Sequence, residues 1–330
     1  MMTIFNSYTK NYALAVFLVL LGAVYIGAAE LVLWSQVTDI WYLHFVEFGW
    51  PEIDKPVDSK HVVNGYPFIL RQLVTYPFFA FALLLNIDPN TLYSFSLPFA
   101  ATSVVWCIAR TAEILSGRTA GLLAISLLIP ITLLFFFMSG RIPFALAGFS
   151  LVLYCQLGLQ DRLLPVRVFL ASLGLLLSSV ATGTMILTFT TIVMLDGYRF
   201  LARRRPSEFI TSFVCLLWAG LPMFWIIDKT VRYFLQDNGS LWGMLNHGFG
   251  QLFIKYFDAT LLIGGSVIAL ICFVVCIRIL PRYFPVELLL IMAATLMAGV
   301  LGFSMLAVVV VPTTSAAITA ILNFTGSKPQ

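Results

Sequence analysis

The strongest constraint on the fold is a series of long apolar runs that together fill most of the chain. The clear runs are 11–34, 90–109, 119–138, 142–160, 168–195, 208–227, 259–280 and 287–312. A transmembrane helix needs about 20 mostly apolar residues. Only 10% of the residues are charged and 60% are hydrophobic, whereas soluble domains carry about 25% charged residues. We therefore predict an all-α fold with a single transmembrane domain over 1–330, built from about nine or ten spanning or half-membrane helices.

Several classes of function have no support in the sequence. A net charge of +4 is too small to suggest nucleic-acid binding, and the chain contains no phosphate-binding glycine loop, zinc-protease motif or nucleophile elbow. All five cysteines fall within apolar runs, where they are expected to be buried apolar residues rather than metal ligands. No metal site and no cofactor is expected, although a divalent metal stays open without support from the sequence.

Two topologies compete, because the run 67–87 contains Arg71, Gln72 and two prolines. In one, 67–87 spans the bilayer and 168–195 crosses once, which leaves several basic loops outside and breaks the positive-inside rule. In the other, 67–87 lies along the interface and 168–195 enters and returns, with a break at 181–184. Every short basic loop then faces the cytoplasm, so we favour this second topology, with the N-terminus inside.

Both topologies place two long loops outside the membrane. These are 35–66 and 228–258, and in the favoured topology the first outer loop extends over 35–89 and contains an interfacial helix. These loops contain all the histidines of the chain, which are His44, His61 and His247. A functional site is therefore expected to face outward.

The first outer loop contains candidates for acid–base chemistry. Helical spacing would place His44 beside Glu47, and Asp39 lies just past the end of the first run. A partly desolvated carboxylate there can act as a general base toward a sugar hydroxyl. The alternative is an interfacial helix with aromatic anchors and solvated charges.

Two arginines are candidates for binding phosphate. Arg141 follows Ser139-Gly140 between two apolar runs, and Arg71 follows Tyr66 at the start of the ambiguous run. An arginine at membrane depth costs a few kcal/mol and is a functional candidate by default, and its planar fork suits phosphate. The alternative is a side chain that extends to the lipid headgroups. Arg232 and His247 belong to an aromatic and polar set in the second outer loop, which suits carbohydrate or an amphipathic interface helix equally. Tyr66 and His61 of the first outer loop are further candidates for binding the substrate.

The order of spans and basic turns resembles that of known membrane glycosyltransferases. Ile108-Ala109-Arg110, Ser116-Gly117-Arg118, Ser139-Gly140-Arg141 and Gln160-Asp161-Arg162 mark successive ends of apolar runs. This pattern over residues 10–200 resembles the GT-C type. The stretch 135–157, in which an arginine opens an Ala/Leu-rich helix, resembles the polysaccharide polymerases of the Wzy/EpsG type, although the segment at 179–185 lacks the histidine often found in them.

The resemblance implies glycosyl transfer from a polyprenyl-(pyro)phosphate-linked sugar on the extracytoplasmic side of a bacterial inner membrane. Arg141, and more weakly Arg71, would contact the lipid phosphate, and Asp39 or Glu47 would act on the acceptor hydroxyl. Membrane lipid and other polysaccharide-assembly proteins are the implied partners. The alternative is a non-enzymatic protein, either a transporter of lipid-linked sugars or a membrane assembly subunit.

Overall fold

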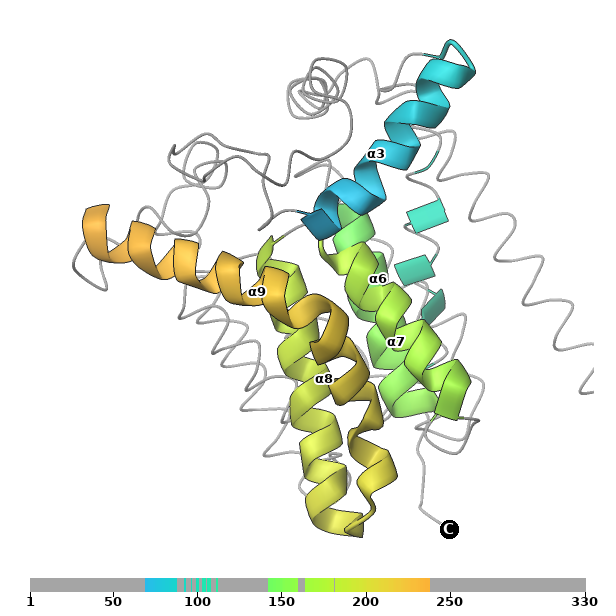
Figure 1. Cartoon of the computed structure of the whole chain (residues 1–330). Coiled ribbons are helices and arrows are strands. Elements are labelled where there is room, and N and C mark those ends of the chain that lie inside the picture. Colours follow the sequence, from blue (N-terminus) through green and yellow to red (C-terminus); the bar gives the residue numbers. More distant parts are fainter. Residues whose placement is uncertain are drawn as a thin grey trace, which may run out of the picture.

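The computed structural model describes residues 69–87, scattered positions between 92 and 111, and the segments 142–159, 164–180 and 182–237 (Figure 1). Regular structure in these segments is entirely helical, as the predicted all-α class requires. The elements are α3 (Ile69–Leu84), α6 (Ile142–Leu153), the π-helix η2 (Tyr154–Gly158), α7 (Leu164–Ser178), α8 (Thr182–Arg203), the 3-10 helix η3 (Pro206–Phe209) and α9 (Ile210–Asp237). The apolar runs 11–34, 119–138, 259–280 and 287–312 lie outside the described residues.

The apolar run 168–195 folds as two helices, as the second topology requires. α7 ends at Ser178 and α8 begins at Thr182, so the break comes slightly earlier than the predicted 181–184. Thr188 of α8 donates a hydrogen bond to the Ser178 hydroxyl at 2.9 Å, which joins the two helices near the break. The start of α7 and the end of α8 meet at the opposite end of the bundle, so the helices run in opposite directions.

α6 and α7 pack with their backbones in contact. A Cβ atom built on Gly174 would lie 2.6 Å from the Gly148 carbonyl oxygen, and one built on Gly148 would lie 2.6 Å from the Ser178 backbone nitrogen. Small residues permit this close approach of helices where apolar surroundings give little driving force for association. The Ser178 hydroxyl is also 3.4 Å from the Ala145 carbonyl. The start of α6 therefore lies beside the end of α7.

α3 meets the bundle at this same end. Tyr76 and Phe79 are buried and pack with Val180 of the α7–α8 turn, while Leu70 joins the main core cluster. The helix closes with Asn86 in the left-handed region (φ 52°), where the Asn86 N–H reaches Leu83 and the Ile87 N–H reaches Ala82, both at 3.0 Å. These bonds satisfy carbonyls at the helix end. The predicted helix within 67–87 is confirmed, and its position relative to a membrane stays a prediction.

α9 is longer than its apolar run. It begins at Ile210, contains Pro222 and continues to Asp237, and Figure 1 shows it bending and running across the end of the bundle. A proline within a helix removes a backbone hydrogen bond and produces such bends. Residues 228–237, expected at the start of the second outer loop, are therefore helical.

Two segments of the described chain are long and apolar enough to cross a membrane, judged by length and composition. They are Thr184–Arg203, within α8, and Pro206–Trp225, which covers η3 and more than half of α9. Large apolar side chains are exposed along α9, among them Phe213, Leu217, Leu221 and Phe224, and Phe200 and Leu201 are exposed in the last turn of α8. Their exposure favours an apolar environment around these helices.

Candidate functional site

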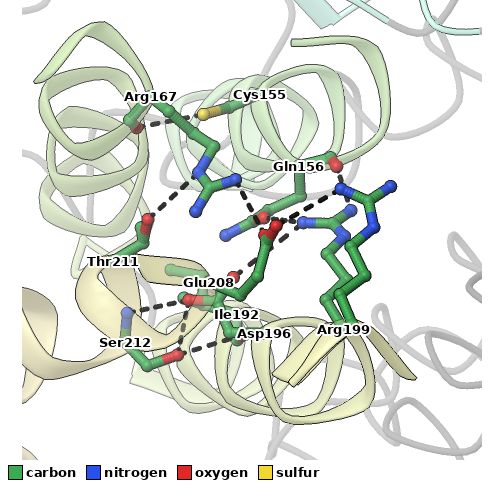
Figure 2. A network of polar contacts seen from close by, with 10 residues as sticks. Cys155, Gln156, Arg167, Ile192, Asp196, Arg199, Glu208, Thr211 and Ser212 are labelled. Atoms are coloured by element: carbon green, nitrogen blue, oxygen red, sulfur yellow. Dashed lines mark hydrogen bonds and ion pairs between the residues drawn. The ribbon is translucent and has the colours of Figure 1, made fainter. Parts of the chain in front are cut away.

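Charged and polar side chains gather at one end of the bundle, where η2 and α8 end and where α7 and α9 begin (Figure 2). We call this cluster the polar network. Its members are Gln156, Arg167, Asp196, Arg199, Arg203, Glu208, Thr211 and Ser212. All are buried except Arg203, whose side chain is 43% exposed. Because an uncompensated buried charge costs several kcal/mol, the geometry of these contacts determines what the network can do.

Arg199 is joined to Gln156 by two hydrogen bonds. Nη1 donates to Oε1 at 2.6 Å, and Nη2 donates to the backbone oxygen of Gln156. Gln156 is the central residue of the π-helix η2. A π turn interrupts the regular backbone ladder, and such turns occur often at functional positions. The Gln156 carbonyl lies in the last turn of this helix, where carbonyls have no partner within the helix, and it accepts from an arginine of another helix.

Asp196 connects α8 to the first turn of α9. Its Oδ2 accepts from the Ser212 backbone N–H at 2.9 Å and from the Ser212 hydroxyl at 2.8 Å, and its Oδ1 lies 3.9 Å from Arg199 Nη1. The first N–H groups of a helix have no partner within the helix, and a carboxylate is favourable at this positive end. Asp196 therefore caps α9 and also balances the charge of Arg199.

Glu208 bridges two arginines. Its Oε2 lies 3.4 Å from Arg167 Nη1, and its Oε1 lies 3.3 Å from Arg203 Nη1. The Nε of Arg167 also donates to the Thr211 hydroxyl at 3.3 Å, and its backbone oxygen accepts from the Cys155 thiol at 3.0 Å. With three arginines and two carboxylates the network carries one net positive charge. Its charges are largely paired with one another, which suits it to holding helix ends together.

None of the residues predicted to form the functional site belongs to the polar network. The favoured topology places these arginines in cytoplasmic turns, and no role was predicted for Gln156 or Asp196. A signal was nevertheless present, because amides and carboxylates within apolar runs are rare and usually have a partner. What the sequence lacked was the identity of each partner, since Gln156 and Arg199 are 43 positions apart.

Arg71 is the one predicted site residue whose side chain the structure describes. It is the third residue of α3 and is only 8% exposed. The Thr75 hydroxyl donates to its backbone oxygen at 3.0 Å, and its neighbour Leu70 packs in the main core cluster. Burial of this kind does not fit a side chain extended to lipid headgroups. Arg71 therefore brings a cation to the end of the bundle opposite the polar network.

The other predicted site residues are not brought together by the described part of the chain. Asp39, His44, Glu47, His61, Tyr66, Arg141 and His247 lie outside the described residues. Arg232 lies within α9, but its side chain is not among those that the structure describes. Their expected assembly into one site stays a prediction.

The described segments contain neither a disulfide nor a group of side chains that could form a metal site. Cys107, Cys155 and Cys215 are free and buried, as expected of small apolar residues. Within the same segments, no three side chains of histidine, cysteine, aspartate or glutamate lie close enough together to hold a metal ion. The remaining cysteines, Cys272 and Cys276, are outside the described residues.

Comparison of the chain with protein-family models, with curated proteins and with solved structures gave no match in any of the three. The function proposed below therefore depends on the residues of this chain and on the resemblance noted from its sequence.

Proposed function

We propose that the chain is a multi-pass membrane protein that transfers a sugar or oligosaccharide from a polyprenyl-(pyro)phosphate-linked donor at the extracytoplasmic surface. Polymerisation of a surface polysaccharide is the form of this reaction that we favour. The basic turn after α8 would face the cytoplasm, and the end of the bundle that holds Arg71 would face outward. This orientation follows the distribution of arginines in the short loops.

The burial of Arg71 is the observation that carries the proposal. Arg71 is only 8% exposed, so its guanidinium is largely desolvated and its attraction to an anion is stronger than it would be in water. Its planar fork can give two parallel hydrogen bonds to one phosphate group. An arginine in this position would stabilise the charge that develops on the phosphate as the glycosidic bond breaks.

The chemistry at the acceptor would depend on the first outer loop. Asp39 or Glu47 would remove the proton from the attacking hydroxyl as the sugar–phosphate bond breaks, with His44 orienting the carboxylate. The leaving group would be the polyprenyl phosphate or pyrophosphate, held by Arg71 and Arg141. The acceptor in a polymerase would be a second lipid-linked repeat unit.

Complementation of a deletion strain tests this function. Surface glycans are compared after expression of the parent chain, Arg71→Ala, Arg71→Lys and the control Leu73→Ala, whose side chain is 46% exposed on the same helix. We expect Arg71→Ala to remove most of the polymer at unchanged levels of inserted protein. Arg71→Lys should retain part of it, because the charge remains but the fork is lost.

Two results would contradict the proposal. One is a deletion strain with unchanged surface and lipid-linked glycans, and the other is full polymer from Arg71→Ala. Purified protein in vesicles separates transfer from the non-enzymatic alternative. An enzyme yields a lengthened glycan, whereas a transporter only moves the lipid-linked sugar between leaflets.

A further inference from the structure

We propose that the turn between α8 and α9 is a binding site for an anionic phospholipid. The site consists of the exposed arginines Arg203, Arg204 and Arg205 together with apolar side chains on both sides of the turn. It rests on the membrane placement proposed above and does not depend on glycosyl transfer.

The surface of the turn is cationic. Three consecutive arginines, Arg203 to Arg205, are exposed where α8 gives way to η3. The carboxylates of the neighbouring sequence are turned inward, because Asp196 is fully buried and Glu208 is 7% exposed. Among the described residues, no hydrogen bond or ion pair holds the side chain of Arg204 or Arg205. Their charges are therefore available to an anion from outside the protein.

Large apolar side chains flank this cationic surface on both helices. Leu201 is 76% exposed, and Phe200 and Phe209 are each 41% exposed. The two phenylalanine rings meet edge to face across the turn, with their centroids 6.4 Å apart. Phe213, one turn further along α9, is 54% exposed. A free phosphate would contact the arginines alone, whereas a phospholipid would use both the cationic and the apolar parts.

The backbone conformation of Arg204 allows its charge to be removed without straining the turn. Its φ is 53°, and its N–H donates to the Phe200 carbonyl at 2.7 Å. This arrangement ends α8 at a position where glycine is the usual residue, because side chains disfavour the left-handed region. The chain therefore carries an arginine where glycine would be more stable. Arg204→Gly removes the charge and relieves the backbone at the same time.

Lipid titration of the full-length purified chain tests the site. The protein in neutral detergent is titrated with phosphatidylglycerol, phosphatidylcholine, glycerol 3-phosphate or inorganic phosphate, and bound lipid is counted by native mass spectrometry. We expect the parent chain to prefer phosphatidylglycerol. Arg204→Gly/Arg205→Gln should bind phosphatidylglycerol roughly 10- to 30-fold more weakly, since each of the two arginines contributes a similar share of the attraction to an anionic lipid. Arg204→Lys/Arg205→Lys should retain the preference.

A charge-matched control and an apolar variant complete the design. Lys55→Gln/Lys60→Gln removes the same charge from the predicted outer loop and should leave lipid binding unchanged. Leu201→Ser should weaken the binding of phosphatidylglycerol and leave any binding of glycerol 3-phosphate unchanged. Equal binding of phosphatidylglycerol and phosphatidylcholine by the parent chain would overturn the proposal. So would a loss of phosphatidylglycerol binding in the lysine control as large as that in the arginine variant, or displacement of bound lipid by glycerol 3-phosphate at the same concentration as the lipid. The readout needs no glycan, so failure here leaves the Arg71 test unaffected.

Discussion

The carboxylate of Asp196 accepts both the backbone N–H and the hydroxyl of Ser212, at 2.9 Å and 2.8 Å. One side chain on α8 thereby caps the first turn of α9. It also lies beside Arg199, which in turn bonds to the π-helix at Gln156. The relative positions of η2, α8 and α9 therefore depend on a short chain of buried polar contacts.

Asp196 should be essential for stability. Asp196→Ala would leave Arg199 with its positive charge buried and would remove the cap of α9, and breaking a buried pair in this way costs about 3–5 kcal/mol. Thermal unfolding of the purified protein in detergent should show a large fall in the midpoint. Ser207→Ala, at an exposed serine just before α9, is the control and should leave the midpoint unchanged. An unaltered midpoint in Asp196→Ala would refute this role.

The α6–α7 contact should tolerate no side chain at Gly174. Gly174→Ala would place Cβ 2.6 Å from the Gly148 carbonyl oxygen, so the two backbones would have to separate. We expect a loss of about 1–3 kcal/mol, typical of overpacking. Gly197→Ala on α8 is the matched control, because its Cβ would meet nothing within 4 Å, and alanine should raise stability slightly. Equal unfolding midpoints for the two variants would show that the helices do not touch as described.

Gln156 should be replaceable only by another acceptor. Gln156→Leu removes an acceptor from buried Arg199, and hydrogen bonds to charged groups contribute about 1.5–3 kcal/mol. Gln156→Glu should unfold at a higher temperature than Gln156→Leu, because its carboxylate can still accept from the guanidinium. Denaturant titration in mixed micelles compares the two. The role fails if leucine and glutamate have the same effect.

The sequence predicted the helical elements better than their contacts. Counting arginines in the short loops predicted that 168–195 would turn back, and the structure divides this run between α7 and α8. The residues Ser179 and Val180 form the turn, although neither signals a break by type. The end of α9 was missed because apolar content falls at Asp228, whereas the helical backbone continues.

The polar network could not be predicted from sequence, for a physical reason. Its hydrogen bonds join residues far apart along the chain, such as Arg167 with Thr211, which are separated by 44 positions. Sequence spacing predicts partners within one helix but not between helices. For the same reason, the contacts within the proposed outward site cannot be predicted from sequence, since its members come from several separate segments. Of the predicted site residues, Arg71 alone has a side chain that the structure describes. Its residue type made it a candidate, but its burial was not predictable from the sequence.

Side-specific labelling tests the central claim most directly, that the chain spans a membrane with the α8–α9 turn inside and the first outer loop outside. Cysteine is introduced at Ser207 of the turn or at Ser59 of the loop, and intact spheroplasts are treated with a membrane-impermeant maleimide, with the parent chain as background. We predict that Ser59→Cys is labelled in intact spheroplasts and that Ser207→Cys is labelled only after permeabilisation. Labelling of both positions from the same side would contradict the orientation and, with it, the function proposed for the outward end.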